Sequence, residues 1–136
     1  MLGAITGDII GSIYESPLRN IKTKSFPLFQ PYSCFTDDTV LTIAIADGIL
    51  NGSSYTDKLK EYYHRYPNAG YGRNFRRWAA SDDTKPYYSF GNGSGMRVSP
   101  VAYAFNDLET VQQEALKSAA VTDIRTDFLH KLSMNV

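Results

Sequence analysis

The first residues that could do chemistry form the run Phe35-Thr36-Asp37-Asp38-Thr39, directly ahead of an apolar helical pattern over 40–50. Adjacent carboxylates repel each other, but a helix N-terminus tolerates them because its free N–H groups carry partial positive charge. Hydroxyl and carboxylate oxygens are hard donors, which suit Mg²⁺, Mn²⁺ or Ca²⁺. The run therefore predicts either a divalent-cation site or an ordinary acidic helix cap.

A second candidate site is the glycine-rich segment Ser89-Phe90-Gly91-Asn92-Gly93-Ser94-Gly95. Its glycines allow backbone N–H groups to approach an anion closely, and the helix expected next would add its dipole. The segment is not a P-loop, because no Gly-Lys-Ser/Thr follows, and it is not a Rossmann fingerprint, because no strand precedes it. A phosphate-binding loop and a flexible turn both remain open.

The elements that must position these segments are helical, which predicts an all-α fold, a compact orthogonal helical domain. Apolar periodicity and turn residues predict helices over 1–14, 38–50, 56–66, 73–80, 96–105 and from a capping box at 106–109 to about 122. Irregular loops are expected over 17–34, 67–72 and 81–95. In the first helix, Gly3, Gly7 and Gly11 share one face, where we expect another backbone to pass close. Asp8 is interpreted as a buried structural hydrogen-bonding residue.

Composition narrows the class of protein. The chain has 136 residues, 43% of them hydrophobic and 21% charged, and a formal net charge of zero. We therefore expect one soluble cytoplasmic domain, with no membrane segment and no electrostatic attraction to nucleic acid. The one cysteine, Cys34, excludes an internal disulfide and is expected to be a small core residue. The two histidines are far apart, which argues against a zinc site.

Three segments in order resemble the ADP-ribosylglycohydrolase family: GDIIGSIYE at 7–15, FTDDT at 35–39 and GNGSGMRVSP at 91–100. The turn at 67–72 also matches a glycine-bearing loop of that family. Each motif alone is moderately specific, whereas their order over residues 2–105 is a strong match.

The resemblance implies a binuclear Mg²⁺ or Mn²⁺ site and hydrolysis of the bond that joins ADP-ribose to a protein side chain, or of a related ester. It implies that Thr36, Asp37 and Asp38 are metal ligands and that Glu15, Asp37 and Asp38 are catalytic. The less favoured alternative for Glu15 is a surface residue at a helix end. Such chemistry needs a carboxylate to activate water near C1 of an oxocarbenium-like sugar. The residues implied to hold ADP-ribose are Gly70, Tyr71, Gly72, Ser89, Phe90, Gly91, Asn92 and Gly93.

The chain departs from the family near its C-terminal end. Members are longer and carry their other metal ligands in an Asp-x-Asp-Thr-type motif, whereas Asp123 and Asp127 here have the wrong spacing. We expect a truncated family-like domain at 1–122, a divergent tail at 123–136 and an incomplete metal-ligand set. Apolar faces left uncovered on the 40–50 helix and the C-terminal helix would favour self-association into a homo-oligomer.

Three functions remain open from the sequence. The chain is a hydrolase of ADP-ribosyl bonds, an inactive remnant that binds ADP-ribose or one divalent cation, or a helical interaction module. In the third case an aromatic surface would bind the partner. That surface would comprise Tyr62, Tyr63, Tyr66, Tyr71, Phe75, Trp78, Tyr87 and Tyr88. Neighbouring arginines allow RNA stacking, although core aromatics flanked by snorkelling arginines are favoured. Arg97 is expected either to reach a phosphate or, preferably, to form a structural ion pair.

Overall fold

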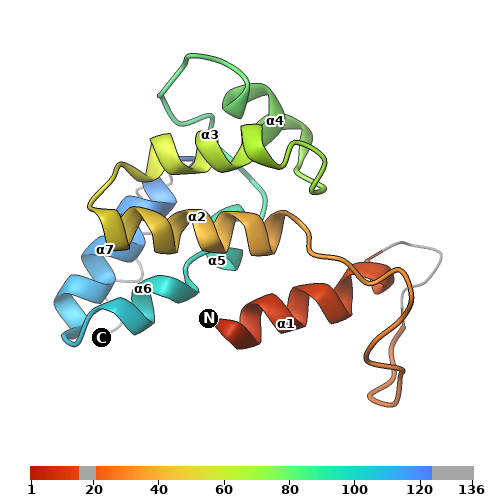
Figure 1. The fold of residues 1–136 in the computed structure, drawn as a ribbon. Coiled ribbons are helices and arrows are strands. Elements are labelled where there is room, and N and C mark those ends of the chain that lie inside the picture. Colours follow the sequence, from red (N-terminus) through yellow and green to blue (C-terminus); the bar gives the residue numbers. More distant parts are fainter. Residues whose placement is uncertain (16–20, 124–136) are drawn as a thin grey trace.

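The computed structural model describes residues 1–15 and 21–123, and these form helices and no strand, which confirms the all-α fold (Figure 1). In chain order the elements are α1 (Leu2–Gly11), the short 3-10 helix η1 (Ser12–Tyr14), α2 (Asp37–Asn51), α3 (Tyr55–Arg65), α4 (Arg73–Ala79), α5 (Gly93–Met96), α6 (Ser99–Ala104) and α7 (Leu108–Ala120). Apart from Asp123, the expected C-terminal tail lies outside the described residues.

Helix α2 is the centre of the arrangement, with α3 on one side of it and α1 and α6 on the other (Figure 1). Its buried residues Val40, Leu41, Ala44 and Ile45 are at most 3% exposed and form the middle of the core. The helix begins after Thr36, whose side chain accepts a hydrogen bond from the Asp38 backbone N–H, and it ends at Gly52, which has a left-handed backbone conformation.

The aromatic residues between α3 and the loop after α4 belong largely to the core. Tyr71, Phe75 and Trp78 are buried, and the Tyr71 and Phe75 rings stack with their centroids 5.2 Å apart. The Trp78 indole N–H donates to the Lys85 carbonyl oxygen at 2.9 Å. Tyr88, in contrast, is 63% exposed. The core interpretation of this cluster is therefore favoured over an aromatic partner surface.

Three sequence expectations about helix ends need correction. The helix expected over 96–105 is the shorter α6, which begins at Ser99 after α5 has ended at Met96, because Pro100 lacks a backbone N–H and fits the first turn of a new helix. The first α-helix stops at Gly11, and the 3-10 turn η1 follows it. The cap of α7 is Asp107, whose carboxylate accepts the Thr110 N–H at 2.8 Å.

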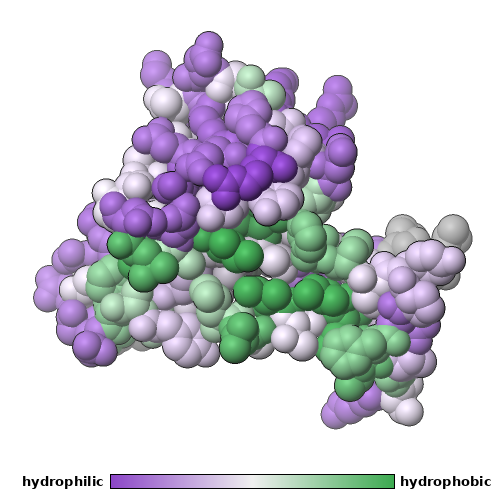
Figure 2. All heavy atoms as spheres, in the orientation of Figure 1, coloured by the Kyte–Doolittle hydropathy of each residue, from purple (hydrophilic) through white to green (hydrophobic). Residues whose placement is uncertain are grey.

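Helix α1 is more open than the sequence predicts. Outside the helix's own backbone, no described atom lies within 4 Å of a Cβ built at Gly3, Gly7 or Gly11, so the expected close approach of another backbone is absent from this part of the chain. Leu2 is 78% exposed. Figure 2 shows an apolar band across the face where α1 and α2 lie. Cys34 is exposed, so its assignment to the core was wrong; the loop that carries it runs along the surface.

Candidate functional site

The buried carboxylate of Asp8 joins α1 to the beginning of α2. One of its oxygens accepts the backbone N–H groups of Thr36 at 2.8 Å and Thr39 at 3.1 Å. The other accepts the Thr36 hydroxyl at 2.6 Å. This confirms the structural role expected of Asp8. An anion that accepts these donors satisfies N–H groups that a helix N-terminus otherwise leaves free.

Glu15, Asp37 and Asp38 lie close enough to Asp8 to influence one another's ionisation. Burial, followed by the charge of Asp38, raises the pKa of Asp37 to about 6. Burial and then the charge of Asp8 raise the pKa of Asp38. The pKa of Glu15 is raised by burial, then by Asp38 and Asp8. The end of the first helical segment therefore lies near the beginning of α2.

When these carboxylates are ionised, their negative charges repel one another. Among the described residues, no salt bridge reaches Glu15, Asp37 or Asp38. Crowded hard oxygens without a cationic side chain suit a divalent cation chemically. However, the part of the chain that the structure describes brings no three His, Cys, Asp or Glu side chains together closely enough to hold a metal ion. Thr36, Asp37 and Asp38 thus offer the donor atoms that a metal site needs. They are too few to form a complete set of ligands.

The turn between α3 and α4 closes over this acidic run. Gly70 has a φ of 99°, in the left-handed region, and a Cβ there would lie 3.5 Å from a carboxylate oxygen of Asp37 and 4.0 Å from the Thr36 Cβ. These distances are ordinary van der Waals contacts, so it is the left-handed backbone conformation that favours glycine at this position. The next residue, Tyr71, is buried, and burial followed by the charge of Asp37 raises the pKa of its hydroxyl.

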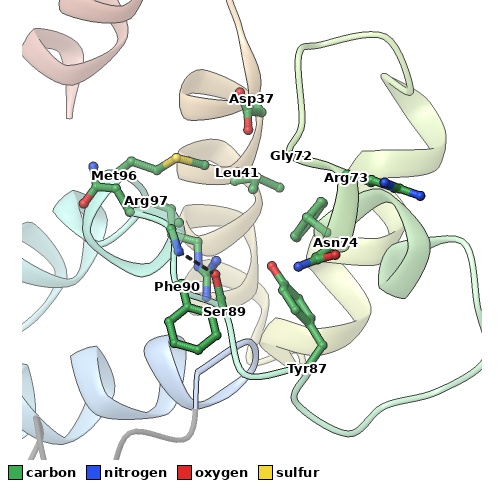
Figure 3. A pocket seen from close by; sticks show the side chains of 14 residues that line it. Asp37, Leu41, Gly72, Arg73, Asn74, Tyr87, Ser89, Phe90, Met96 and Arg97 are labelled. Atoms are coloured by element: carbon green, nitrogen blue, oxygen red, sulfur yellow. Dashed lines mark hydrogen bonds between the residues drawn. The ribbon is translucent and has the colours of Figure 1, made fainter.

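A pocket of about 500 Å³ joins the acidic run to the glycine-rich segment (Figure 3). The side chains and backbone that line it include Asp37 from α2, Gly72 from the turn before α4, and Ser89, Phe90, Gly91, Asn92 and Gly93. Segments more than 50 positions apart in the chain thus meet at one cavity, whose size suits a small-molecule ligand.

Not every predicted site residue lines this pocket. Glu15, Thr36, Asp38, Gly70 and Tyr71 do not, and Tyr71 instead packs into the aromatic core. The pocket includes Arg73, Asn74 and Tyr87, which sequence reasoning did not assign to the site. The one indication in the sequence was that they lie within two positions of the predicted turn at 67–72 or of the glycine-rich segment.

Arg97 fixes the glycine-rich segment to the end of α7 through hydrogen bonds. Its fully buried guanidinium donates to the carbonyl oxygen of Ser118 on α7 at 2.7 Å and to the hydroxyl of Thr122, in the turn after α7, at 3.0 Å. The Thr122 carbonyl oxygen accepts the Ser89 N–H at 3.0 Å, so the end of α7 and the turn after it hold the segment at Ser89 and, through Arg97, just beyond Gly95. Burial lowers the pKa of Arg97 to about 10. The expected ion pair is absent among the described residues; the role is structural through oxygen acceptors.

The Asp8 contacts lead to the first prediction. Asp8→Asn replaces an acceptor-only carboxylate by an amide whose NH₂ must face at least one donor, so we expect the free energy of unfolding to fall by about 1–3 kcal/mol. Urea denaturation followed by circular dichroism measures this. Asp82→Asn, at an exposed position, is the matched control and should change stability little. Equal losses in both variants would contradict the role of Asp8.

The raised pKa of Asp37 leads to the second prediction. Because the folded pKa of about 6 exceeds the ordinary 3.8, the protonated form stabilises the fold. That contribution is fully present below pH 3.8 and is lost as pH rises through about 6. Without divalent cations, wild type should lose stability relative to Asp37→Asn over this window. Urea denaturation at several pH values measures the difference, and a constant difference would refute the shift.

The described residues contain no helix that is both long and apolar enough to cross a lipid bilayer.

Comparisons with known proteins agree with the motifs. Residues 1–127 match the sequence model of the family described as ADP-ribosylglycohydrolase. Curated relatives include the protein "ADP-ribosylhydrolase ARH3" from Bos taurus, Homo sapiens and Danio rerio, at 27%, 26% and 27% identity. Each alignment covers 90% of this chain but 42%, 43% and 40% of the respective relative, so the chain spans less than half of their length. No solved structure gives a significant match. Because the family match extends over most of its length, the protein belongs to the ADP-ribosylglycohydrolase family.

Proposed function

We propose that this chain forms the ADP-ribose-binding part of a hydrolase that cleaves N- or O-glycosidic ADP-ribosyl bonds. The observation that carries the proposal is the pocket shared by Asp37 and the glycine-rich segment. Its lining combines a carboxylate with a glycine-rich backbone whose N–H groups few side chains obstruct. A ligand that combines a ribose with phosphates has matching chemistry, because backbone N–H groups bind phosphate and carboxylates bind sugar hydroxyls or a metal beside them.

The acidic side is suited to ribosyl transfer to water. A transition state with positive charge on the sugar is stabilised by nearby carboxylates, and an acid whose pKa is about 6 can exchange a proton near neutral pH. Asp37 and Asp38 are proposed for this role, with Glu15 facing them from the first helical segment. These positions support the catalytic assignment carried over from the family.

A divalent cation, Mg²⁺ or Mn²⁺, is proposed as the cofactor. Thr36, Asp37 and Asp38 would hold it through hard oxygen donors, and it would supply charge neutralisation and Lewis acidity when bound. Because these groups are an incomplete set, full ligation needs oxygens from outside the described residues. The same incompleteness favours a second candidate function, an ADP-ribose-binding protein that does not turn substrate over.

The third prediction tests the pocket by calorimetry with ADP-ribose. Gly72 has an extended backbone, φ −61° and ψ 150°, and no neighbour within 4 Å of a Cβ, so the fold accepts Gly72→Val while the added side chain narrows the pocket. Affinity for ADP-ribose should fall at least about tenfold. Gly11→Val, an equally open position on α1, should leave the affinity unchanged. Absent binding in wild type, with and without Mg²⁺, would refute the proposed function.

Turnover separates the two candidate functions. Release of ADP-ribose from a modified protein, lost in Asp37→Ala, would support the hydrolase. Binding without release would support the non-catalytic alternative. The cytoplasmic location stays a prediction that fractionation of cells can test.

We also propose that the chain self-associates. Leu2, Leu50 and Leu108 are 78%, 83% and 63% exposed, and an apolar band crosses α1 and α2 (Figure 2). Burial of such surface by a second copy would contribute about 25 cal/mol per Å².

The fourth prediction is therefore a dimer at micromolar concentration, measured by size-exclusion chromatography with light scattering. Leu2→Ser should shift the distribution toward monomer, because it removes exposed apolar surface from α1 without touching the core. A monomer at all concentrations would contradict self-association.

A further inference from the structure

Three arginines form a stripe on the solvent side of α4. Arg73, Arg76 and Arg77 occupy positions i, i+3 and i+4 of this helix, which places them on one face. All three are exposed, whereas Phe75 and Trp78 on the opposite face are buried. We call this set the arginine stripe.

The cations of the arginine stripe lack partners within the described residues, where no salt bridge, hydrogen bond or ring contact involves their guanidinium groups. Other cations nearby are engaged. Lys58 pairs with Asp47 and Glu61 at 2.9 Å. The Lys60 ammonium donates to the Trp78 carbonyl oxygen at 3.0 Å. Three clustered and uncompensated guanidiniums therefore stand out on a chain whose formal net charge is zero.

The stripe begins at the rim of the pocket. Arg73 and Asn74 line the pocket, yet Figure 3 shows the Arg73 side chain running outward, away from Asn74 and Tyr87. The positive charge therefore leads from the pocket opening along the outer face of α4. Asp37 on α2 lines the same pocket, so an acidic and a basic side chain both contribute to its lining.

We propose that the arginine stripe binds an acidic segment of a protein partner beside the pocket. Guanidinium groups bind carboxylates bidentately, and three of them in one helical register match a short run of Asp or Glu. A long polyanion fits less well, because it needs basic surface beyond three guanidiniums, and the chain as a whole has a formal net charge of zero. The partner would be the protein whose modified side chain enters the pocket, and this identification rests on the proposed function. The binding of an acidic segment does not depend on it.

The test uses the full chain and a fluorescein-labelled ten-residue peptide of alternating Glu and Gly, followed by fluorescence anisotropy at low salt. The variant Arg76→Gln/Arg77→Gln removes two charges and leaves the pocket-lining Arg73 in place. The matched control is Lys22→Gln/Lys24→Gln, which removes the same charge from exposed positions on the loop after α1, away from α4 (Figure 1). A ten-nucleotide single strand with the same label serves as the competing polyanion.

We expect the peptide to bind wild type, with affinity falling about fivefold in the arginine variant and little in the lysine control. The difference should shrink as salt is raised. Absence of peptide binding, or equal losses in both variants, overturns the proposal. Tighter binding of the oligonucleotide, lost in the arginine variant, assigns the stripe to nucleic acid instead and overturns it as well. Calorimetry with ADP-ribose on the same variants reports separately on the proposed function, because Arg76 and Arg77 do not line the pocket.

Discussion

The carboxylate of Asp8 is the contact on which the arrangement of the site depends. It accepts three hydrogen bonds from Thr36 and Thr39, and it thereby fixes the start of α2 against α1. Because α1 is otherwise open on its glycine face, this contact has few substitutes among the described residues. The position of Asp37 and Asp38, and their proximity to Glu15, follows from it.

The other side of the pocket depends on a different anchor. Arg97 bonds to Ser118 on α7 and to Thr122 in the turn after it, and Ser89 also bonds to Thr122, so a segment that contains three glycines is held on both sides. Burial of a guanidinium is costly, and here oxygen acceptors on Ser118 and Thr122 offset part of that cost. The pocket therefore lies between the acidic run and the glycine-rich segment, each of which is anchored separately. Both segments carry polar groups that can bind a ligand or a cation.

Local features of the site were predictable because they depend on residues near one another in the chain. The acidic cap of α2, the all-helical content and the order of the motifs all followed from spacing and turn residues. Predictions about distant contacts were less successful. Cys34 is exposed, Arg97 has no acidic partner among the described residues, and Tyr71 packs with Phe75 in the core. In each case the burial and the partners of the side chain depend on which surface a neighbouring segment covers.

The sequence by itself determined the helical class, the family resemblance, and which oxygen-bearing and glycine-rich segments could do chemistry. Tertiary structure decided that Asp37 and the segment 89–93 share one pocket, that Arg73, Asn74 and Tyr87 join it, and that the arginine stripe begins at its rim. The physical reason is that helix caps and periodicity are set by bonds within a few residues. A pocket, in contrast, is formed by the packing of segments that are far apart in the sequence, and sequence spacing does not show which of them will meet.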